Sequence, residues 1–270
     1  MKTVYVRVIV PALTLVLHVS TVPTTRAQQT TEPGQEGSET ANSVSVPHAE
    51  LLAGAGITTR SLRFGSAAAN RALDTGVVPA LAIELESHVG QQWFCQLRLA
   101  YRSSVFAEGS QQAPSAASAI TTTLQSHEFI GGLEPGVHFG GIHSASVAVF
   151  AGYGVRAFGS VVELAIPRFS LHGPVIRTAL ALPLWGGRFE LRLAPEVHII
   201  VGQTLALRED ARTERQGFAL GVEASARLVL DWLALQASYR ESHARIASAW
   251  PTQFSDVERF ALFSVGLLYN

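Results

Sequence analysis

Short segments of alternating apolar and polar residues fill most of the chain after residue 50. The clearest of them runs from Arg188 to Val201. One set of alternate positions is wholly apolar: Phe189, Leu191, Leu193, Pro195, Val197, Ile199 and Val201. The other set is Arg188, Glu190, Arg192, Ala194, Glu196, His198 and Ile200. Successive side chains of a strand point to opposite faces, so this period of two predicts a β-strand with one apolar and one charged face.

Ten such segments follow one another, at 54–66, 76–88, 91–103, 121–137, 144–156, 169–183, 188–201, 215–229, 231–244 and 257–269. Each has at least the 9–11 residues of a tilted membrane-spanning strand. Short connections near Gly90, Gly140-Gly141, Gly186-Gly187 and Asp231 alternate with long ones at 67–75, 104–120, 157–168, 202–214 and 245–256. Short turns on one side and long loops on the other predict an all-β, antiparallel up-and-down transmembrane barrel of ten strands, within a range of 8–12.

The two faces of the strands determine which side meets lipid. An outward Arg near the membrane midplane costs about 2–4 kcal/mol, so the charged face is expected to line the lumen. Because unpaired buried charges are costly, we expect these side chains to form ion pairs across a lumen with little or no open pore. The expected lumen network is Glu84, Glu86, Arg98, Arg102, Glu128, Arg177, Arg188, Glu190, Arg192, Glu196, Glu223, Arg227 and Arg240, with Glu134 and Arg156 as further inward candidates.

A soluble, lipocalin-like barrel would need the opposite polarity, with its apolar face inside. The last segment favours the membrane alternative. Its residues Phe263, Val265, Gly266, Leu267 and Tyr269 resemble the C-terminal assembly signal of bacterial outer-membrane barrels, although Asn270 rather than an aromatic residue is last. We therefore expect contact with the outer-membrane assembly machinery.

The N-terminus has the layout of a cleaved secretory signal peptide. Lys2 and Arg7 precede a short apolar stretch, and small residues stand before a cleavage site after Ala27. Residues 28–50 are polar and predict a disordered periplasmic leader, which leaves 51–270 as the barrel.

Composition excludes several classes of protein. The chain is 47% hydrophobic and 15% charged, yet no uninterrupted run of 18 apolar residues follows Ala27. Its net charge of −1 argues against nucleic-acid binding. Cys95 is the only cysteine, so the chain has no internal disulfide. We expect it to face lipid without a chemical role.

Three stretches are similar to poorly characterised outer-membrane β-barrel proteins of myxobacteria and related bacteria. They are Arg60-Ser61-Leu62-Arg63-Phe64, Phe150-Ala151-Gly152-Tyr153-Gly154-Val155-Arg156 and Leu230-Asp231-Trp232-Leu233-Ala234-Leu235. The resemblance covers about 51–270. It implies an architecture and a location in the outer membrane, and it carries over no active site.

Catalytic motifs are weak in this sequence. His127-Glu128 begins like a zinc-protease motif, but Gly131 occupies the position of the second His. Omptin-like proteases need an Asp-x-His pair, which none of the four Asp of the mature chain provides. Lipid-A-modifying barrels use His with Ser or Glu, and the candidates here are Glu128, His172, Glu196, His198, Ser242 and His243. His138 and His143 bracket a short turn and are a weak candidate metal pair.

The sequence therefore predicts a monomeric outer-membrane barrel with a charge-filled lumen. Its role would be structural or in surface recognition through the extracellular loops, with no catalytic residue, metal or cofactor. Expected partners are outer-membrane lipids, including lipopolysaccharide. The alternatives are a narrow porin-like channel, an outer-membrane hydrolase or lipid-A-modifying enzyme, and a soluble lipocalin-like carrier.

Overall fold

The computed structural model describes residues 49–66, 69–111, 120–140, 143–160, 169–205, 217–246 and 253–269. All of them belong to one compact unit. The strands are β1 (Ala49–Ser66), β2 (Ala69–Gly90), β3 (Trp93–Gln111), β4 (Ile120–His138), β5 (Ser146–Ser160), β6 (Phe169–Leu184), β7 (Phe189–Ile200), β8 (Gly202–Leu205), β9 (Gly217–Leu230), β10 (Leu233–Ile246) and β11 (Gln253–Tyr269). A single 3-10 turn spans Trp185–Gly187. Among these residues no helix is long and apolar enough to cross a membrane. The expected signal peptide and residues 28–48 of the leader lie outside the described residues.

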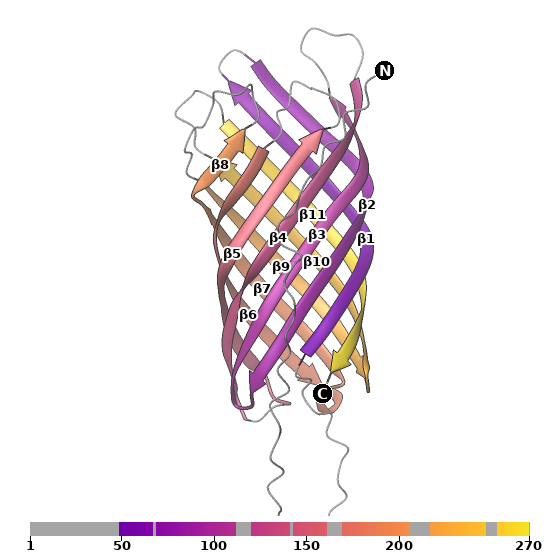
Figure 1. Cartoon of the computed structure of the whole chain (residues 1–270), viewed down its shortest axis with the longest axis vertical. Helices are drawn as coiled ribbons and strands as arrows, with labels where there is room; N and C mark the ends of the chain where they lie inside the picture. Colours follow the sequence, from indigo (N-terminus) through magenta and orange to yellow (C-terminus); the bar gives the residue numbers. More distant parts are fainter. Residues whose placement is uncertain are drawn as a thin grey trace, which may run out of the picture. The chain divides into compact units, whose positions relative to one another are not determined.

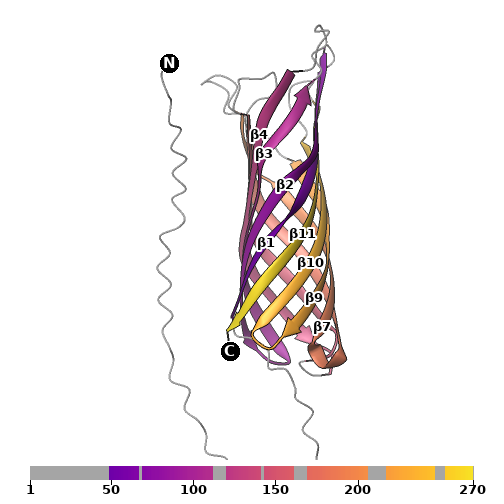
Figure 2. The ribbon, with the colours of Figure 1, turned by 90° about the vertical axis from the view of Figure 1, so that its right-hand side faces the viewer.

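The strands close into a barrel (Figure 1). Neighbouring barrel strands pair antiparallel, and β5 pairs with β6, so the sheet has no gap at that point. The ring closes where β1 pairs with β11, from Ala49 opposite Tyr269 to Gly65 opposite Gln253 (Figure 2). β7 and β8 both pair with β6 and occupy one position in the ring. The eleven strands therefore form ten strand positions around the barrel, which we call staves. The predicted ten-stranded antiparallel barrel is confirmed.

The seventh stave is broken at Val201. β7 pairs with β6 between Val175 and Leu184, whereas β8 pairs with Phe169–His172 of the same strand. At the break, a Cβ atom on Gly173 would lie 1.8 Å from the carbonyl oxygen of Ile199, so only glycine allows the backbones to approach this closely.

Two ends of the barrel differ in their connections. At the short-turn end, β2–β3, β6–β7 and β9–β10 are joined by tight turns, one of which holds Asp231 at a φ of 50°. At the opposite end, the loop end, the strands run further than the sequence predicts. Residues 69–75, expected in a loop, belong to β2 because β1 and β2 stay paired as far as Ser66 and Ala69. Ala49 and Glu50, assigned to the leader, are likewise the first residues of β1.

The strands are longer than a membrane crossing requires. β2 has 22 residues. At roughly 3.3 Å per residue and a tilt of about 40°, it extends about 55 Å along the barrel axis. An apolar band is about 25 Å tall, so β1 to β4 project well beyond it at the loop end (Figure 1).

Side-chain exposure follows the alternation. On β7, Leu193 is 49% exposed while its neighbour Ala194 is 1% exposed. On β3, Leu97 and Tyr101 face outward, whereas Arg98 between them is buried in the lumen. At the C-terminus the outward residues are Phe263, Val265, Leu267 and Tyr269. Gly266 faces inward, where a Cβ atom would lie 3.0 Å from Oε1 of Glu50.

Candidate functional site

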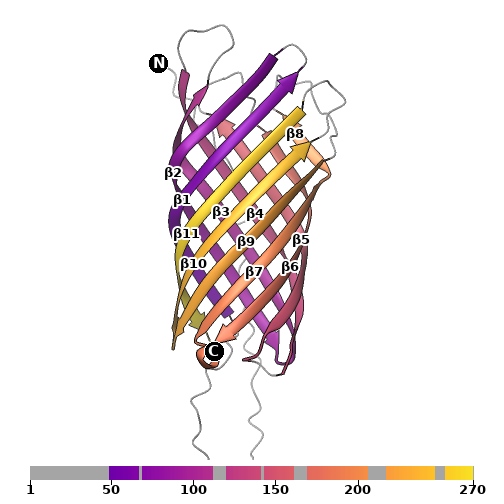
Figure 3. The same ribbon diagram turned by 180° about the vertical axis from the view of Figure 1, so that it is seen from behind.

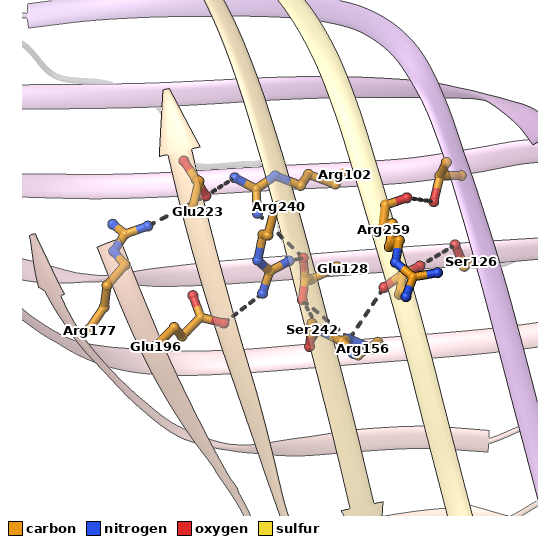
Figure 4. A network of polar contacts seen from close by, with 12 residues as sticks. Arg102, Ser126, Glu128, Arg156, Arg177, Glu196, Glu223, Arg240, Ser242 and Arg259 are labelled. Atoms are coloured by element: carbon orange, nitrogen blue, oxygen red, sulfur yellow. Dashed lines mark hydrogen bonds and ion pairs between the residues drawn. The ribbon is translucent and has the colours of Figure 1, made fainter. Parts of the chain in front are cut away.

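Charged side chains cross the middle of the lumen and join opposite walls of the barrel (Figure 4). Arg102 on β3 donates to Glu84 on β2 at 2.9 Å and reaches Glu223 on β9 at 2.8 Å. Arg98, four residues earlier on β3, pairs with the same two carboxylates at 2.9 and 3.3 Å. Each of these side chains is at most 6% exposed, so the pairs lie in a space with little water.

Glu128 is the second centre of the network. Its carboxylate accepts a hydrogen bond from Arg156 at 2.8 Å and another from Arg240, and Arg102 lies 3.7 Å away. Arg240 also donates to Glu196 at 2.6 Å. Strands β3, β4, β5, β7 and β10 are thereby connected through the lumen rather than only along the sheet.

A third group lies nearer the loop end, on the two strands that close the barrel. Arg60 on β1 donates to both oxygens of Asp256 on β11, at 2.9 and 2.6 Å, and pairs with Glu258 at 3.4 Å. Asp256 is completely buried. Bidentate geometry of this kind is the strongest form of a carboxylate–guanidinium pair.

A cluster of buried apolar residues, the apolar plug, lies in the lumen on the loop-end side of these charges. We use this name for Leu62, Leu73, Val78, Phe158, Phe169, Leu171, Ile200, Ala219, Ala244 and Ile246, which form one cluster. Leu62 and Leu73 are fully buried, and the guanidinium of Arg60 lies 4.8 Å from the centre of the Phe158 ring. The interior thus changes from charged to apolar toward the loop end.

A small cavity of about 120 Å³ lies at the short-turn end of the lumen. Glu134 closes its inner side, paired with Arg177 at 2.9 Å and with Arg192. Glu50 and Arg227 pair across its rim. His138 and His143 also line the cavity. Within the described ranges, no group of three or more His, Cys, Asp or Glu has the arrangement needed to hold a metal ion.

The structure brings together most of the predicted lumen residues. Ion pairs include Glu84, Glu86, Arg98, Arg102, Glu128, Arg177, Arg192, Glu196, Glu223, Arg227 and Arg240. Glu190 is half-buried at the cavity without an ion pair to a described side chain. The prediction that Arg188 belongs to the lumen network is wrong. Arg188 is exposed in the turn before β7, because the strand begins only at Phe189.

Sequence reasoning missed four members of the network. Glu50 fell in the expected leader and Asp256 in an expected loop, because the strands run past their alternating segments. Arg60 and Glu258 lay inside predicted strands. The sequence alone does not show that Arg60 points inward beside a carboxylate, because that requires the register between β1 and β11.

The residues weighed for lipid-A chemistry do not meet at one site. Glu128, Glu196, His198 and Ser242 are buried in the lumen, with Arg156 between Glu128 and Ser242. His172 and His243 are on the outer surface. His172 forms a hydrogen bond with the Tyr153 hydroxyl at 2.5 Å, and His243 contacts Glu241 at 2.6 Å. The barrel wall separates the two groups.

No protein-family model and no curated protein sequence matches the chain. The chain is similar to solved structures of outer-membrane barrels. The outer membrane protease OmpT from Escherichia coli is similar with a TM-score of 0.55 and 7% identity, over 82% of this chain and 96% of that one. The translocator domain of the autotransporter NalP from Neisseria meningitidis matches with a TM-score of 0.43 and 11% identity, over 83% of this chain and 90% of that one. At 7% identity the similarity to the protease supports the fold alone, a closed antiparallel β-barrel.

Proposed function

We propose that this protein is a non-conducting outer-membrane barrel that holds its extracellular loops above the cell surface, with a structural or recognition role carried by those loops. The observation that supports this most directly is the filled lumen. Among the described residues, paired charges occupy its middle and the apolar plug lies toward its loop end. From this arrangement we infer that a solute has no continuous polar path. A channel needs a lining that hydrates ions.

The outer surface supports the membrane location. At the short-turn end, Trp93, Trp185, Trp232 and Tyr269 are each more than half exposed. Toward the loop end, outward Tyr101, Tyr153 and Tyr239 bind polar partners. Aromatic girdles of this kind flank the apolar band of outer-membrane barrels, with the long loops outside the cell.

Gel mobility of the membrane fraction tests the location. A folded barrel of this kind resists SDS until it is boiled, so we expect the protein in the detergent-extracted membrane fraction with a heat-dependent shift. Recovery as a soluble periplasmic protein without a shift would contradict the proposal and favour a lipocalin-like carrier. N-terminal sequencing of the mature chain is expected to begin at Gln28.

Single-channel recording tests the closed lumen. We expect no discrete conductance steps when the heat-modifiable protein is reconstituted in planar bilayers, whereas a general porin treated in the same way gives them. Reproducible steps from the folded protein would replace the scaffold proposal by the porin-like alternative.

The finer expectations extend the same proposal. A monomer is favoured because the barrel closes on itself and buries its charges internally. The outward position of Phe263, Val265, Leu267 and Tyr269 on β11 supports the proposal that these residues form an assembly signal. We infer that the chain is related to the myxobacterial-type barrels that it resembles.

A further inference from the structure

We propose that the outer surface of β10, β11 and β1 binds a phosphorylated, multiply acylated lipid of the outer leaflet. The proposal rests on the membrane location proposed above and adds a ligand class and a site. Two features of one continuous surface carry it: a group of outward arginines near the loop end and an apolar groove directly below it.

The arginines form the rim patch, defined as Arg63, Glu241, His243, Arg245 and Arg259. Strand pairing brings them together. Arg63 on β1 and Arg245 on β10 both lie opposite Ser255 of β11, one on each side. Arg259 faces outward four residues further along β11, beside Glu241. The three strands lie side by side in Figure 3.

The rim patch carries an excess of positive charge. Arg259 donates to Glu241 at 3.2 Å, and Glu241 also receives the Tyr239 hydroxyl at 2.8 Å. Arg63 and Arg245 are exposed and make no ion pair with any described side chain. Three guanidinium groups against the carboxylates of Glu241 and of the exposed Asp74 on the adjacent β2 leave a net charge of about +1. Guanidinium groups bind phosphate oxygens in bidentate fashion, so this is a surface that fits a phosphate group.

The groove begins at the next outward position. It is a shallow, largely open depression of about 790 Å³ that extends from Ala55 and Ala261 across β10, β9 and β7 to β6. Small residues such as Ala237 and Ala224 form its floor, while Leu193 and Phe263 contribute to its walls. Tyr239 belongs to the groove and also binds Glu241 of the rim patch, so the two features are contiguous. An apolar hollow of this kind accommodates acyl chains by burying their surface.

The depth of the rim patch matches that of lipid headgroups. On β11 the outward side chains are apolar from Tyr269 to Ala261, and Arg259 is the first charged one. Nine residues at roughly 3.3 Å and a tilt of about 40° correspond to roughly 23 Å, close to the height of an apolar band. Arg259 therefore lies where acyl chains would enter the groove. Arg63 and Arg245, opposite Ser255, lie about 10 Å further toward the loop end, at the depth of the phosphorylated headgroup.

A second copy of the chain is a poorer occupant. A two-fold contact brings the same patch of both copies together. The arginines of one copy would then lie against the positively charged patch of the other, and like charges in contact are repulsive. A phosphorylated lipid instead satisfies both the charge and the groove.

Native mass spectrometry of the delipidated, detergent-solubilised protein tests the site. The probes are bis-phosphorylated lipid A, the same lipid without phosphates, and inorganic phosphate. We expect the phosphorylated lipid to be retained, the dephosphorylated lipid to bind at least about tenfold more weakly, and inorganic phosphate to compete poorly. Equal retention of the two lipids would overturn the proposal. Full competition by inorganic phosphate would assign the patch to a free anion instead.

Variants separate the headgroup site from the groove. Arg245→Ala with Arg259→Ala is expected to lower retention of the phosphorylated lipid about a hundredfold, at about tenfold for each charge-assisted contact. Arg188→Ala, an exposed arginine at the opposite end, serves as the matched control and should retain it fully. Ala261→Phe fills the groove and should weaken both lipids. If Ala261→Phe has no effect, or if Arg188→Ala matches the double variant, the site is wrong.

Folding is checked for every variant by the heat-dependent gel shift. Absence of the shift in the native protein contradicts the membrane location, whereas a shifting protein that does not discriminate phosphate overturns only the lipid site. If the native protein is a dimer that Ala261→Phe dissociates, a second copy occupies the groove and the lipid proposal fails.

Discussion

Individual charged residues have different roles inside and outside the barrel. Glu128 lies in the lumen against Arg156 and Arg240, and its side chain is 5% exposed. Glu241 also contacts several partners, but its side chain is 24% exposed and its partner Arg259 is on the surface. Solvent screens the ion pairs of Glu241. The arginines around Glu128 are shielded from water, so the Glu128 carboxylate takes the place of the solvent that would otherwise stabilise their charges.

Glu128→Gln is therefore expected to destabilise the barrel strongly. Breaking a buried pair by removing one partner costs about 3–5 kcal/mol, because the remaining charges are left uncompensated. Glu241→Gln, the matched control, should leave the unfolding free energy nearly unchanged. Urea unfolding in lipid vesicles, followed by tryptophan fluorescence, measures both. Equal stabilities of the two variants would show that the lumen pairs are not energetically important.

At the scale of the strands, alternation fixes which face meets lipid. β7 carries Leu193 outward and Arg192 inward, and a shift of one residue would exchange them. The same strand also shows how far a stave can depart from regularity, because its ladder with β6 breaks at Val201 without changing the faces on either side. The register is thus held by side-chain polarity as well as by hydrogen bonds.

An outward arginine on β7 should be destabilising in a way that depends on depth. Leu193→Arg places a charge near the middle of the outward apolar run and is expected to cost about 2–4 kcal/mol. Val201→Arg is on the same face but at the loop end, where the expected cost is about 0–1 kcal/mol. Unfolding free energies in vesicles give the comparison. A larger cost at Val201 would mean that the membrane band has been placed wrongly along the barrel.

At the scale of the molecule, the two ends of the barrel differ in structure. The short-turn end holds Ala49 and Tyr269, the paired ends of the closing strands. The loop end holds the apolar plug, and it extends beyond the apolar band because β1 to β4 continue past that band. This asymmetry predicts that only the loop end is reachable from outside the cell.

Cysteine labelling of intact cells tests that orientation. In a Cys95→Ala background, Ser115→Cys lies outside the described residues in the β3–β4 connection and is expected to react with a membrane-impermeant maleimide. Gln91→Cys, in the turn between β2 and β3, should react only after the cells are disrupted. The native Cys95 faces outward and should stay unreactive while it is covered by lipid. The reverse pattern would invert the barrel.

The sequence by itself determined the fold class, the number of staves and the two faces. These features follow from local physics: the period of two in segments such as Arg188 to Val201 decides the faces, and connection lengths decide the order of the strands. The positions of Arg98, Glu128 and Arg240 in the lumen could be predicted from the sequence for the same reason.

Only the tertiary structure decided how far the strands run and which charges meet. Arg60 joins Asp256, 196 positions away, because β1 closes against β11, and no local pattern encodes that register. The sequence did not predict the apolar plug, because the alternating pattern distinguishes the two faces of a strand only where those faces differ in polarity. Inward Phe158 and Leu62 have the same apolar character as residues that face lipid, so their place in the lumen depends on the closed barrel around them.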